Sequence, residues 1–257
     1  MKIYHVSDLH ANHHVPFTPN QEKWKINTQQ WMKEVLQGVT GEVLILNGDF
    51  SEWNCQSLWL FEEAAKHFEQ VLVTLGNHDY YLLSKNQRNK YKTSFGRIDE
   101  LFKEASKIPN VVILQKRLHT FKGVTFAGDT MWYDLPTPED YAFYENISND
   151  SNFISTDIPF KKDYKVLHDL SMDWYYALAG KEVDVFVSHI PPVQPSMSSY
   201  SYNACYVTPV PFLVGKHWLA GHQHVQGSFE KAGQHFHMNA YGYPGEVKDY
   251  QLRFFEV

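Results

Sequence analysis

Short apolar runs that end in glycine, asparagine, aspartate or histidine recur along this chain and constrain its fold more than any other feature. They are rich in β-branched side chains and show no polar alternation, which is typical of strands buried on both faces of a sheet. We predict such strands at 3–6, 43–46, 71–75, 111–114, 124–127 and 183–187.

Helical patterns separate the early runs. Strands that alternate with helices predict a layered α/β fold. In the C-terminal third the pattern changes to strands and turns, so a purely alternating architecture is not expected there. The predicted helices cover 21–37, 56–68, 95–107 and 164–179, and the late strands cover 218–220, 234–239 and 251–255.

The composition is that of a globular protein with a sizeable core. Of 257 residues, 43% are hydrophobic and 20% are charged, which excludes a disordered chain and a coiled coil. We expect residues 1–257 to form a single domain, with irregular insertions near 129–162 and 191–211, where periodicity is lost. The formal net charge of −6 disfavours bulk binding to nucleic acid.

The cysteines and the apolar runs bear on the cellular compartment. Cys55 and Cys205 are far apart, so neither a disulfide framework nor a thiolate metal site is indicated. The first residues carry no apolar stretch of signal-peptide length, and no run approaches 18 apolar residues. We therefore expect a cytoplasmic protein that does not associate with a membrane.

Polar residues that can bind metals or transfer protons follow five of the predicted strands. Ligands of open α/β sheets bind outside the carboxyl ends of the strands, so these residues are predicted to converge on one rim. They are Asp8 and His10, Asp49, Asn77 with His78 and Asp79, His189, and His222 with His224.

Imidazole and carboxylate ligands together suit divalent Zn, Fe, Mn, Co or Ni. Seven candidate ligands are too many for one tetrahedral ion, whereas two ions that share a carboxylate would use them. Such a pair can hold a bridging hydroxide and clamp the oxygens of an in-line phosphoryl displacement. His78 then remains as a non-ligand imidazole that could protonate the leaving oxygen or stabilise the transition state. The seven candidates are Asp8, His10, Asp49, Asn77, His189, His222 and His224.

These residues form five ordered motifs, and the sequence resembles the calcineurin-like metallophosphoesterase family, whose motifs are DxH, GDxx(D/E), GNH(D/E), a lone His and GHxH. Each motif alone is a weak signal, but five in order over residues 8–224 are a strong one. Here they read Asp8-Leu9-His10, Gly48-Asp49-Phe50-Ser51-Glu52, Gly76-Asn77-His78-Asp79, His189 and Gly221-His222-Gln223-His224.

The resemblance implies a fold and a division of roles. The family fold is a four-layer αββα sandwich of two mixed β-sheets flanked by helices. His78 would be the transition-state histidine and Asp79 the acid that orients it. One metal would be bound by Asp8, His10, Asp49 and His224, and the other by Asp49, Asn77, His189 and His222, with Asp49 bridging.

The expected activity is hydrolysis of a small phosphate ester that depends on two divalent metal ions, for which manganese, iron, zinc and nickel are all candidates. Attack by a metal-bridging hydroxide would be the chemical step. A phosphodiesterase on a small or nucleotide-like substrate is favoured. The alternatives are a phosphomonoesterase of the same fold, a nuclease and a non-catalytic scaffold. The sequence indicates neither the substrate-binding residues nor the oligomeric state.

Several other residues are open to two interpretations. His13 and His14 follow the first motif, and a structural role is favoured over substrate contact. The basic residues Lys85, Arg88, Lys90 and Lys92 suit a solvated face better than an electrostatic guide for substrate. An aromatic rim that stacks a flat group and ordinary core packing explain Trp132, Tyr133, Tyr200, Tyr202 and Tyr206 about equally well. The remaining histidines are predicted to be surface or core residues: His5, His67, His119, His168, His217, His235 and His237.

Overall fold

The computed structural model describes residues 1–158, 162–198 and 203–257 and contains two mixed β-sheets. In the first sheet the strand order is β11-β1-β2-β3-β4, and β11 alone runs antiparallel to its neighbour. Its strands are β1 (Lys2–Val6), β2 (Gly41–Asn47), β3 (Phe68–Thr74), β4 (Val111–Ile113) and β11 (Arg253–Glu256).

The second sheet has six strands in the order β5-β6-β7-β8-β10-β9. Both edge strands are antiparallel to their neighbours, and the inner strands are parallel. The strands are β5 (Arg117–Phe121), β6 (Val124–Asp129), β7 (Val185–Ser188), β8 (His217–Ala220), β9 (Gln226–Lys231) and β10 (Gln234–Asn239).

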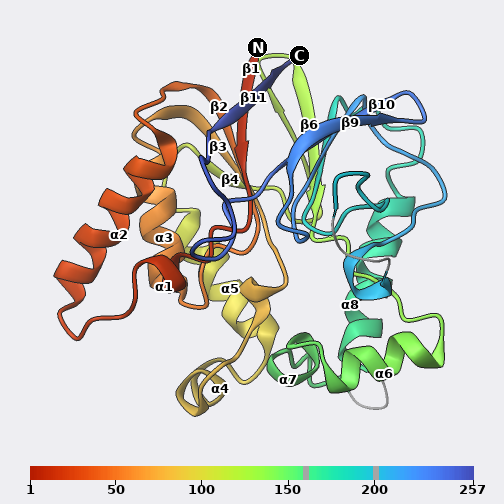
Figure 1. Ribbon diagram of the computed structural model, residues 1–257, viewed down its shortest axis with the longest axis horizontal. Coiled ribbons are helices and arrows are strands. Elements are labelled where there is room, and N and C mark those ends of the chain that lie inside the picture. Colours follow the sequence, from red (N-terminus) through yellow and green to blue (C-terminus); the bar gives the residue numbers. More distant parts are fainter. Residues whose placement is uncertain (159–161, 199–202) are drawn as a thin grey trace.

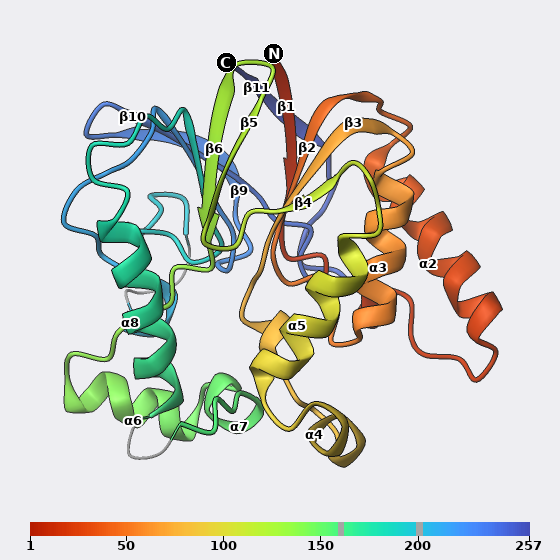
Figure 2. The ribbon, with the colours of Figure 1, turned by 180° about the vertical axis from the view of Figure 1, so that it is seen from behind.

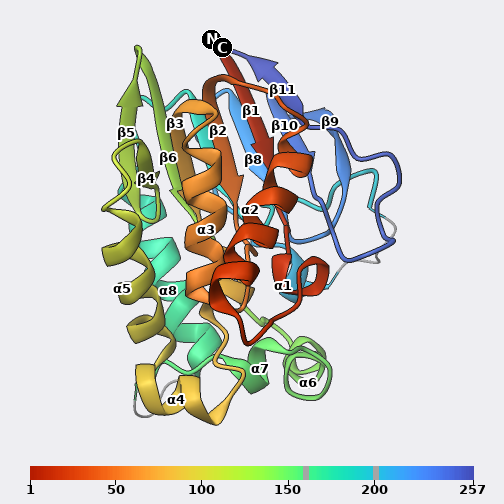
Figure 3. The same ribbon diagram turned by 90° about the vertical axis from the view of Figure 1, so that its left-hand side faces the viewer.

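Helices cover the outer faces of both sheets (Figures 1 and 3). Helices α2 (Gln21–Leu36), α3 (Asn54–Ala64) and α5 (Ser94–Ala105) lie on the first sheet, and α8 (Asp163–Tyr176) lies on the second. The expected αββα sandwich is therefore confirmed. The shorter elements are α1 (Ala11–His14), α4 (Lys85–Tyr91), α6 (Pro138–Asn146), α7 (Asp150–Phe153) and the 3₁₀ turns η1 (His78–Tyr80) and η2 (Ala204–Tyr206).

Strand β2 illustrates why the apolar runs show no alternation. Val43 and Ile45 point into the core between the two sheets, whereas Leu44 and Leu46 point toward the helices. Successive side chains of a strand face opposite sides, so a strand in a middle layer needs apolar residues at every position.

The structure also contains elements that the sequence analysis did not predict. The edge strands β5 and β9 were missed, and the stretch near 129–162 contains α6 and α7 rather than irregular chain alone. Among the described residues, no helix has both the length and the apolar character needed to span a membrane.

The parallel strands place their carboxyl ends on one side of the molecule. Both termini lie at the opposite end, at the top of Figures 1 and 2. The loops that follow β1, β2, β3, β7 and β8 therefore meet at the lower end of the two sheets, which is the predicted rim.

A histidine cluster lies between the two sheets. Nδ1 of His217 and Nε2 of His237 share a 3.1 Å hydrogen bond, and the ring of His237 stacks on Phe255 with centroids 4.2 Å apart. His5 meets both His237 and Phe255 edge-on. Among the described residues, none of these histidines belongs to a group that could hold a metal ion.

The cluster favours neutral imidazoles. Burial, together with the nearby His237 and Arg253, lowers the pKa of His5 to about 3. Burial, together with His217 and His235, lowers the pKa of His237 to about 4. Both values lie below the ordinary value of 6.5, so the unfolded chain takes up these protons at a higher pH than the folded chain does.

We predict that acid destabilises the fold through this cluster. Stability from His5 and His237 is fully present above pH 6.5 and is lost as the pH falls toward their folded pKa values. Between pH 7 and pH 5 the free energy of unfolding should fall by on the order of 3 kcal/mol from these two groups. Urea denaturation of chelator-treated protein at both pH values measures it. His237→Gln, which keeps a neutral hydrogen-bonding side chain, should flatten the dependence, and an unchanged slope would contradict the prediction.

Candidate metal centre

The predicted ligands lie on sharp turns directly after the strands. Five of them adopt left-handed backbone, with φ of 54° at Asp8, 42° at His10, 57° at Asp49, 68° at His222 and 47° at His224. Aspartate and histidine tolerate this region better than most residues. In these turns the backbone changes direction directly after the strand, while the side chain of the predicted ligand remains at the rim.

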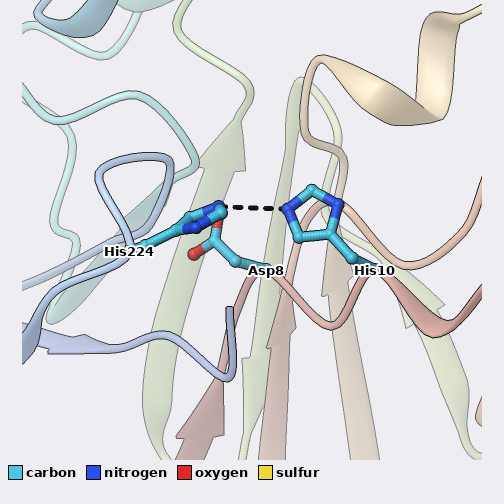
Figure 4. A group of neighbouring side chains, drawn as sticks. All are labelled: Asp8, His10 and His224. Atoms are coloured by element: carbon cyan, nitrogen blue, oxygen red, sulfur yellow. Dashed lines mark hydrogen bonds and ion pairs between the residues drawn. The ribbon is translucent and has the colours of Figure 1, made fainter. Parts of the chain in front are cut away.

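Asp8, His10 and His224 face one another (Figure 4). The Nε2 atoms of His10 and His224 lie 3.0 Å apart, and Nε2 of His224 lies 3.6 Å from Oδ1 of Asp8. His224 thus meets His10, which lies 214 residues earlier in the sequence, and Asp8, which lies earlier still. The three could hold one metal ion.

Asp49, His189 and His222 form a second group. Nε2 of His189 lies 3.2 Å from Oδ2 of Asp49, which is also 3.8 Å from Nε2 of His10. The Asp49 carboxylate therefore lies between the two groups, where a residue that bridges two ions would be required.

Three of the histidines have one ring nitrogen held by an acceptor. Nδ1 of His189 donates to the carbonyl oxygen of Asn47 at 2.9 Å, and Nε2 of His222 donates to the carbonyl oxygen of Cys205 at 3.0 Å. Nδ1 of His224 donates to the Glu246 carboxylate at 2.5 Å. Metal-binding histidines are held by such partners, which fix the tautomer and leave the second nitrogen for the ion.

Asn77 completes the set of predicted ligands. Its Nδ2 donates to Oδ1 of Asp150 and to the hydroxyl of Tyr81, at 2.8 and 3.2 Å. Its Oδ1 is buried and has no hydrogen-bond partner among the described residues. A buried carbonyl oxygen without a partner is costly, and a cation would satisfy it. The donor set of carboxylate, imidazole and amide oxygen therefore fits divalent metal ions.

Two glycines let the strand ends approach closely. A Cβ on Gly76 would lie 2.1 Å from Oδ1 of Asp49, and a Cβ on Gly48 would lie 2.5 Å from Nδ1 of His189. Any side chain at either position would displace a predicted ligand. The glycines of the second and third motifs are thus required by this packing.

His78 forms a third group of neighbouring ligand atoms with His10 and Asp49, and the acid that contacts its ring differs from the sequence prediction. Its Nδ1 donates to Oε1 of Glu52 at 3.1 Å. The Asp79 carboxylate instead accepts from the backbone N–H groups of Asp49, Phe50 and Gly76. The acid that contacts the His78 ring is therefore Glu52 and not Asp79, because Asp79 points back into the turn that it stabilises.

Carboxylates set the protonation of this region. Burial acts to lower the pKa of His78, but Asp49 and Glu52 outweigh it and raise that pKa. Burial acts to raise the pKa of Glu52, but hydrogen bonds from His13 and His78 lower it to about 2. A charged Glu52 beside a readily protonated His78 is an arrangement suited to holding a proton at the site.

The two inner histidines have opposite shifts. Burial acts to lower the pKa of His189, yet the charges of Asp49 and Asp8 raise it to about 10. Burial and the neighbouring His189 lower the pKa of His222 to about 4. A proton on His189 thus balances the buried carboxylates, and a bound cation would replace it.

A cavity of about 200 Å³ opens over the two groups. Its walls come from α6 and α7, from η2, and from the turn at 242–246. The described lining residues include no lysine or arginine. Beyond Asp49, Asn77, His78, His222 and His224, the lining consists of Tyr81, Phe143, Ile147, Ser148, Asn149, Asp150, Cys205, Tyr206, Tyr243 and Glu246.

The structure divides the predicted aromatic rim. Trp132 and Tyr133 are buried in the core, so the rim interpretation is wrong for them. Tyr206 does line the cavity, whereas Tyr200 and Tyr202 lie outside the described residues.

The flanking basic and histidine residues make structural contacts. Arg88 donates to the carbonyl oxygens of Leu82 and Asn152, and Lys90 pairs with Glu100. His14 stacks on Trp31, as the structural interpretation predicted, but His13 lies 3.6 Å from Glu52 at the edge of the site.

Sequence reasoning gave no role to Asp150 or Glu246 and did not identify Glu52 as the partner of His78. Glu52 stands in the second motif and could have been found there. Glu246 ends a Gly-Tyr-Pro-Gly-Glu turn, whose glycines and proline mark a tight turn but not its contact. Asp150 carries no local signal, because its contact with Asn77 spans 73 residues.

Comparisons with known proteins show the family of this chain and its fold. Residues 1–226 match the family model of the calcineurin-like phosphoesterases. The uncharacterized protein L509 of Acanthamoeba polyphaga mimivirus is 21% identical over 216 residues, which is 74% of each chain. The solved structure of the phosphopantetheinyl hydrolase of Mycobacterium tuberculosis superimposes with a TM-score of 0.73 at 17% identity, covering 99% of this chain and 95% of that one. The chain belongs to the calcineurin-like phosphoesterase family, whose members hydrolyse phosphate esters with two divalent metal ions.

Proposed function

We propose that this protein is a phosphodiesterase that acts on a small substrate. We infer that residues 1–257 form one domain. From the segments near 129–162 and 191–211, residues 143, 147–150 and 205–206 line the cavity. Asp8, His10, Asp49 and His224 would hold the first metal ion, and Asp49, Asn77, His189 and His222 would hold the second. The neighbouring ligand atoms of Asp8, His10 and His224 and of Asp49, His189 and His222, together with the unpaired Oδ1 of Asn77, support these sets.

The absence of lysine and arginine among the described cavity-lining residues supports a diester most directly. A diester carries one negative charge and a monoester carries up to two, so a monoester needs more positive charge around it. Glu246 and Asp150 add negative charge to the walls, which disfavours substrates with further phosphates. Phe143, Ile147 and Tyr206 offer surface for an uncharged second ester group.

Each polar group of the site has a distinct part in the proposed reaction. When bound, two divalent ions supply Lewis-acid stabilisation of the phosphoryl oxygens and make water nucleophilic at neutral pH. His78, oriented by Glu52 through Nδ1, keeps Nε2 for donating a proton to the leaving oxygen. Tyr243 stacks on the ring of His10, with centroids 4.2 Å apart, and shields one side of the site from water.

Other substrates and functions are alternatives to a small diester. The M. tuberculosis neighbour is named for hydrolysis of phosphopantetheinyl groups, which makes a phosphopantetheinyl ester a substrate to test. A phosphomonoesterase, a nuclease and a silent scaffold remain alternatives. A small acidic cavity disfavours the nuclease, which must accommodate a polyanion.

We predict that the metal-loaded protein hydrolyses bis-p-nitrophenyl phosphate with a kcat/KM roughly tenfold or more above that for p-nitrophenyl phosphate, because the site compensates one negative charge better than two. Chelator-stripped protein is reloaded with Mn, Zn, Ni or Fe, and release of p-nitrophenol is followed. Asp49→Ala should abolish turnover, and Asp173→Asn, a change on exposed α8 surface, should leave it intact. Turnover of the monoester alone would reject the diesterase proposal.

We predict that the effect of His78→Ala depends on the leaving group. For a diester with an alkyl leaving group, kcat should fall by about 10²–10⁴, the range for loss of a general acid. For bis-p-nitrophenyl phosphate the loss should be smaller, because p-nitrophenolate departs without a proton. Steady-state kinetics on both substrates test this, with Glu52→Gln expected to show a weaker form of the same pattern. An equal loss on the two substrates would remove His78 as the proton donor.

We predict that a negative charge at the mouth of the cavity weakens substrate binding. Ile147 is 66% exposed and lines the cavity. Ile147→Asp should raise KM for the diester severalfold and leave kcat nearly unchanged, since the residue belongs to none of the groups that could hold a metal ion. Ile26→Asp, at a similarly exposed position on α2, is the matched control and should change neither constant. Unchanged KM in both variants would show that substrate does not pass Ile147.

A further inference from the structure

Asp150 is a buried carboxylate that the reaction described above does not use. It is the first residue of α7 and is 3% exposed. Its Oδ1 accepts hydrogen bonds from Nδ2 of Asn77 at 2.8 Å and from the hydroxyl of Tyr81 at 2.6 Å. Its Oδ2 accepts from the hydroxyl of Tyr133 at 2.5 Å. A buried carboxylate whose three side-chain donors are all neutral is costly to keep in the fold. This cost suggests that the carboxylate has a functional role.

The contact with Asn77 restricts the amide of that residue to one orientation. An ionised carboxylate can only accept hydrogen bonds, so the amide must present its NH₂ group to Asp150. The Asn77 oxygen is then on the other side of the amide, where it is buried without a hydrogen-bond partner among the described residues. Reversal of the amide would place two oxygens against each other and would turn N–H donors toward the ligand side.

We propose that Asp150 is a positioning residue that keeps the Asn77 oxygen available to the second metal ion. This inference rests on the proposed ligand set. The hydroxyl of Tyr81 donates to the same Asp150 oxygen as Asn77 does, the hydroxyl of Tyr133 donates to the other oxygen, and α7 brings the carboxylate to the rim from a segment that lies outside the five motifs. Retention of the second ion therefore depends on the folded state of that segment as well as on the motifs.

Asp150→Asn tests the proposal because it keeps the shape of the side chain while allowing the Asn77 amide to reverse. Chelator-stripped protein is titrated with Mn²⁺ by calorimetry, and bound metal is counted by elemental analysis. Wild-type protein should bind two ions. The variant should keep the first ion and bind the second about 10–100-fold more weakly, the usual effect of removing an outer partner of a ligand.

Two further variants separate positioning from a general loss of structure. Glu139→Gln makes the same acid-to-amide change at an exposed position of α6 and should bind both ions normally. Tyr133→Phe removes a donor to Asp150 without touching Asn77, so it should lower the melting temperature of the stripped protein but leave the second ion bound. Asp150→Asn should instead lose the second ion. Its melting temperature should therefore rise less on adding metal than that of the wild-type protein does.

The outcomes also separate this inference from the proposed function. If wild-type protein fails to bind two ions, the ligand assignment itself is wrong. If wild-type protein binds two and Asp150→Asn binds both with unchanged affinity, the ligand assignment stands and the role of Asp150 is rejected. If both affinities fall together with the stability of the stripped protein, Asp150 has only a structural role.

Discussion

Two fully buried ionisable side chains, Asp79 and Arg97, join the loops that follow β2 and β3, and the metal centre depends on them. Asp79 accepts hydrogen bonds from the backbone N–H groups of Asp49 and Gly76, and so connects the two turns. Arg97 of α5 donates to the carbonyl oxygens of Ser51, His78 and Tyr81 from the other side. Backbone groups in tight turns cannot pair within a sheet or helix, and leaving them unpaired in the interior is costly. Asp79 and Arg97 satisfy these groups and hold the Asp49 carboxylate between the two ligand groups.

Bringing the predicted ligands together at the rim requires strained backbone. Five predicted ligands, Asp8 and His224 among them, have positive φ, a conformation that costs of order 1–3 kcal/mol in a residue other than glycine. Strain of this kind persists only where the surrounding structure determines the conformation. Here the surroundings are two rigid sheets with a continuous apolar core between them, which fixes where each strand ends. The four layers therefore do more than support the rim, because their stability offsets the unfavourable turns.

The sequence predicted the layers and the motif positions well, and it failed where signals were polar or distant. Buried strands such as β2 were found because burial on both faces demands apolar runs. Strands β5 and β9 are edge strands with many exposed polar residues, and each enters a hairpin through a two-residue turn with both φ values positive, Lys122-Gly123 and Ala232-Gly233. Such X-Gly pairs are the available signal for them. The partner of His78 was misplaced because adjacency in sequence suggested Asp79, whereas the turn geometry directs that carboxylate to backbone N–H groups and leaves the ring to Glu52.

The contacts of the segment between β6 and α8 bear on how this protein combines metal binding with selectivity. Ile147 faces the cavity mouth, and Asp150, three residues later, contacts the predicted ligand Asn77. Both lie in or beside short helices whose sequence shows little periodicity. Arg88 of α4 also contacts this segment by donating a hydrogen bond to the carbonyl oxygen of Asn152. A change that reshapes the cavity wall for another substrate would therefore also disturb the orientation of the Asn77 amide. Substitutions in this segment are therefore constrained by the metal centre even where they contact substrate alone. The wall around Tyr206 is constrained in the same way, because the carbonyl oxygen of Cys205 accepts a hydrogen bond from the predicted ligand His222.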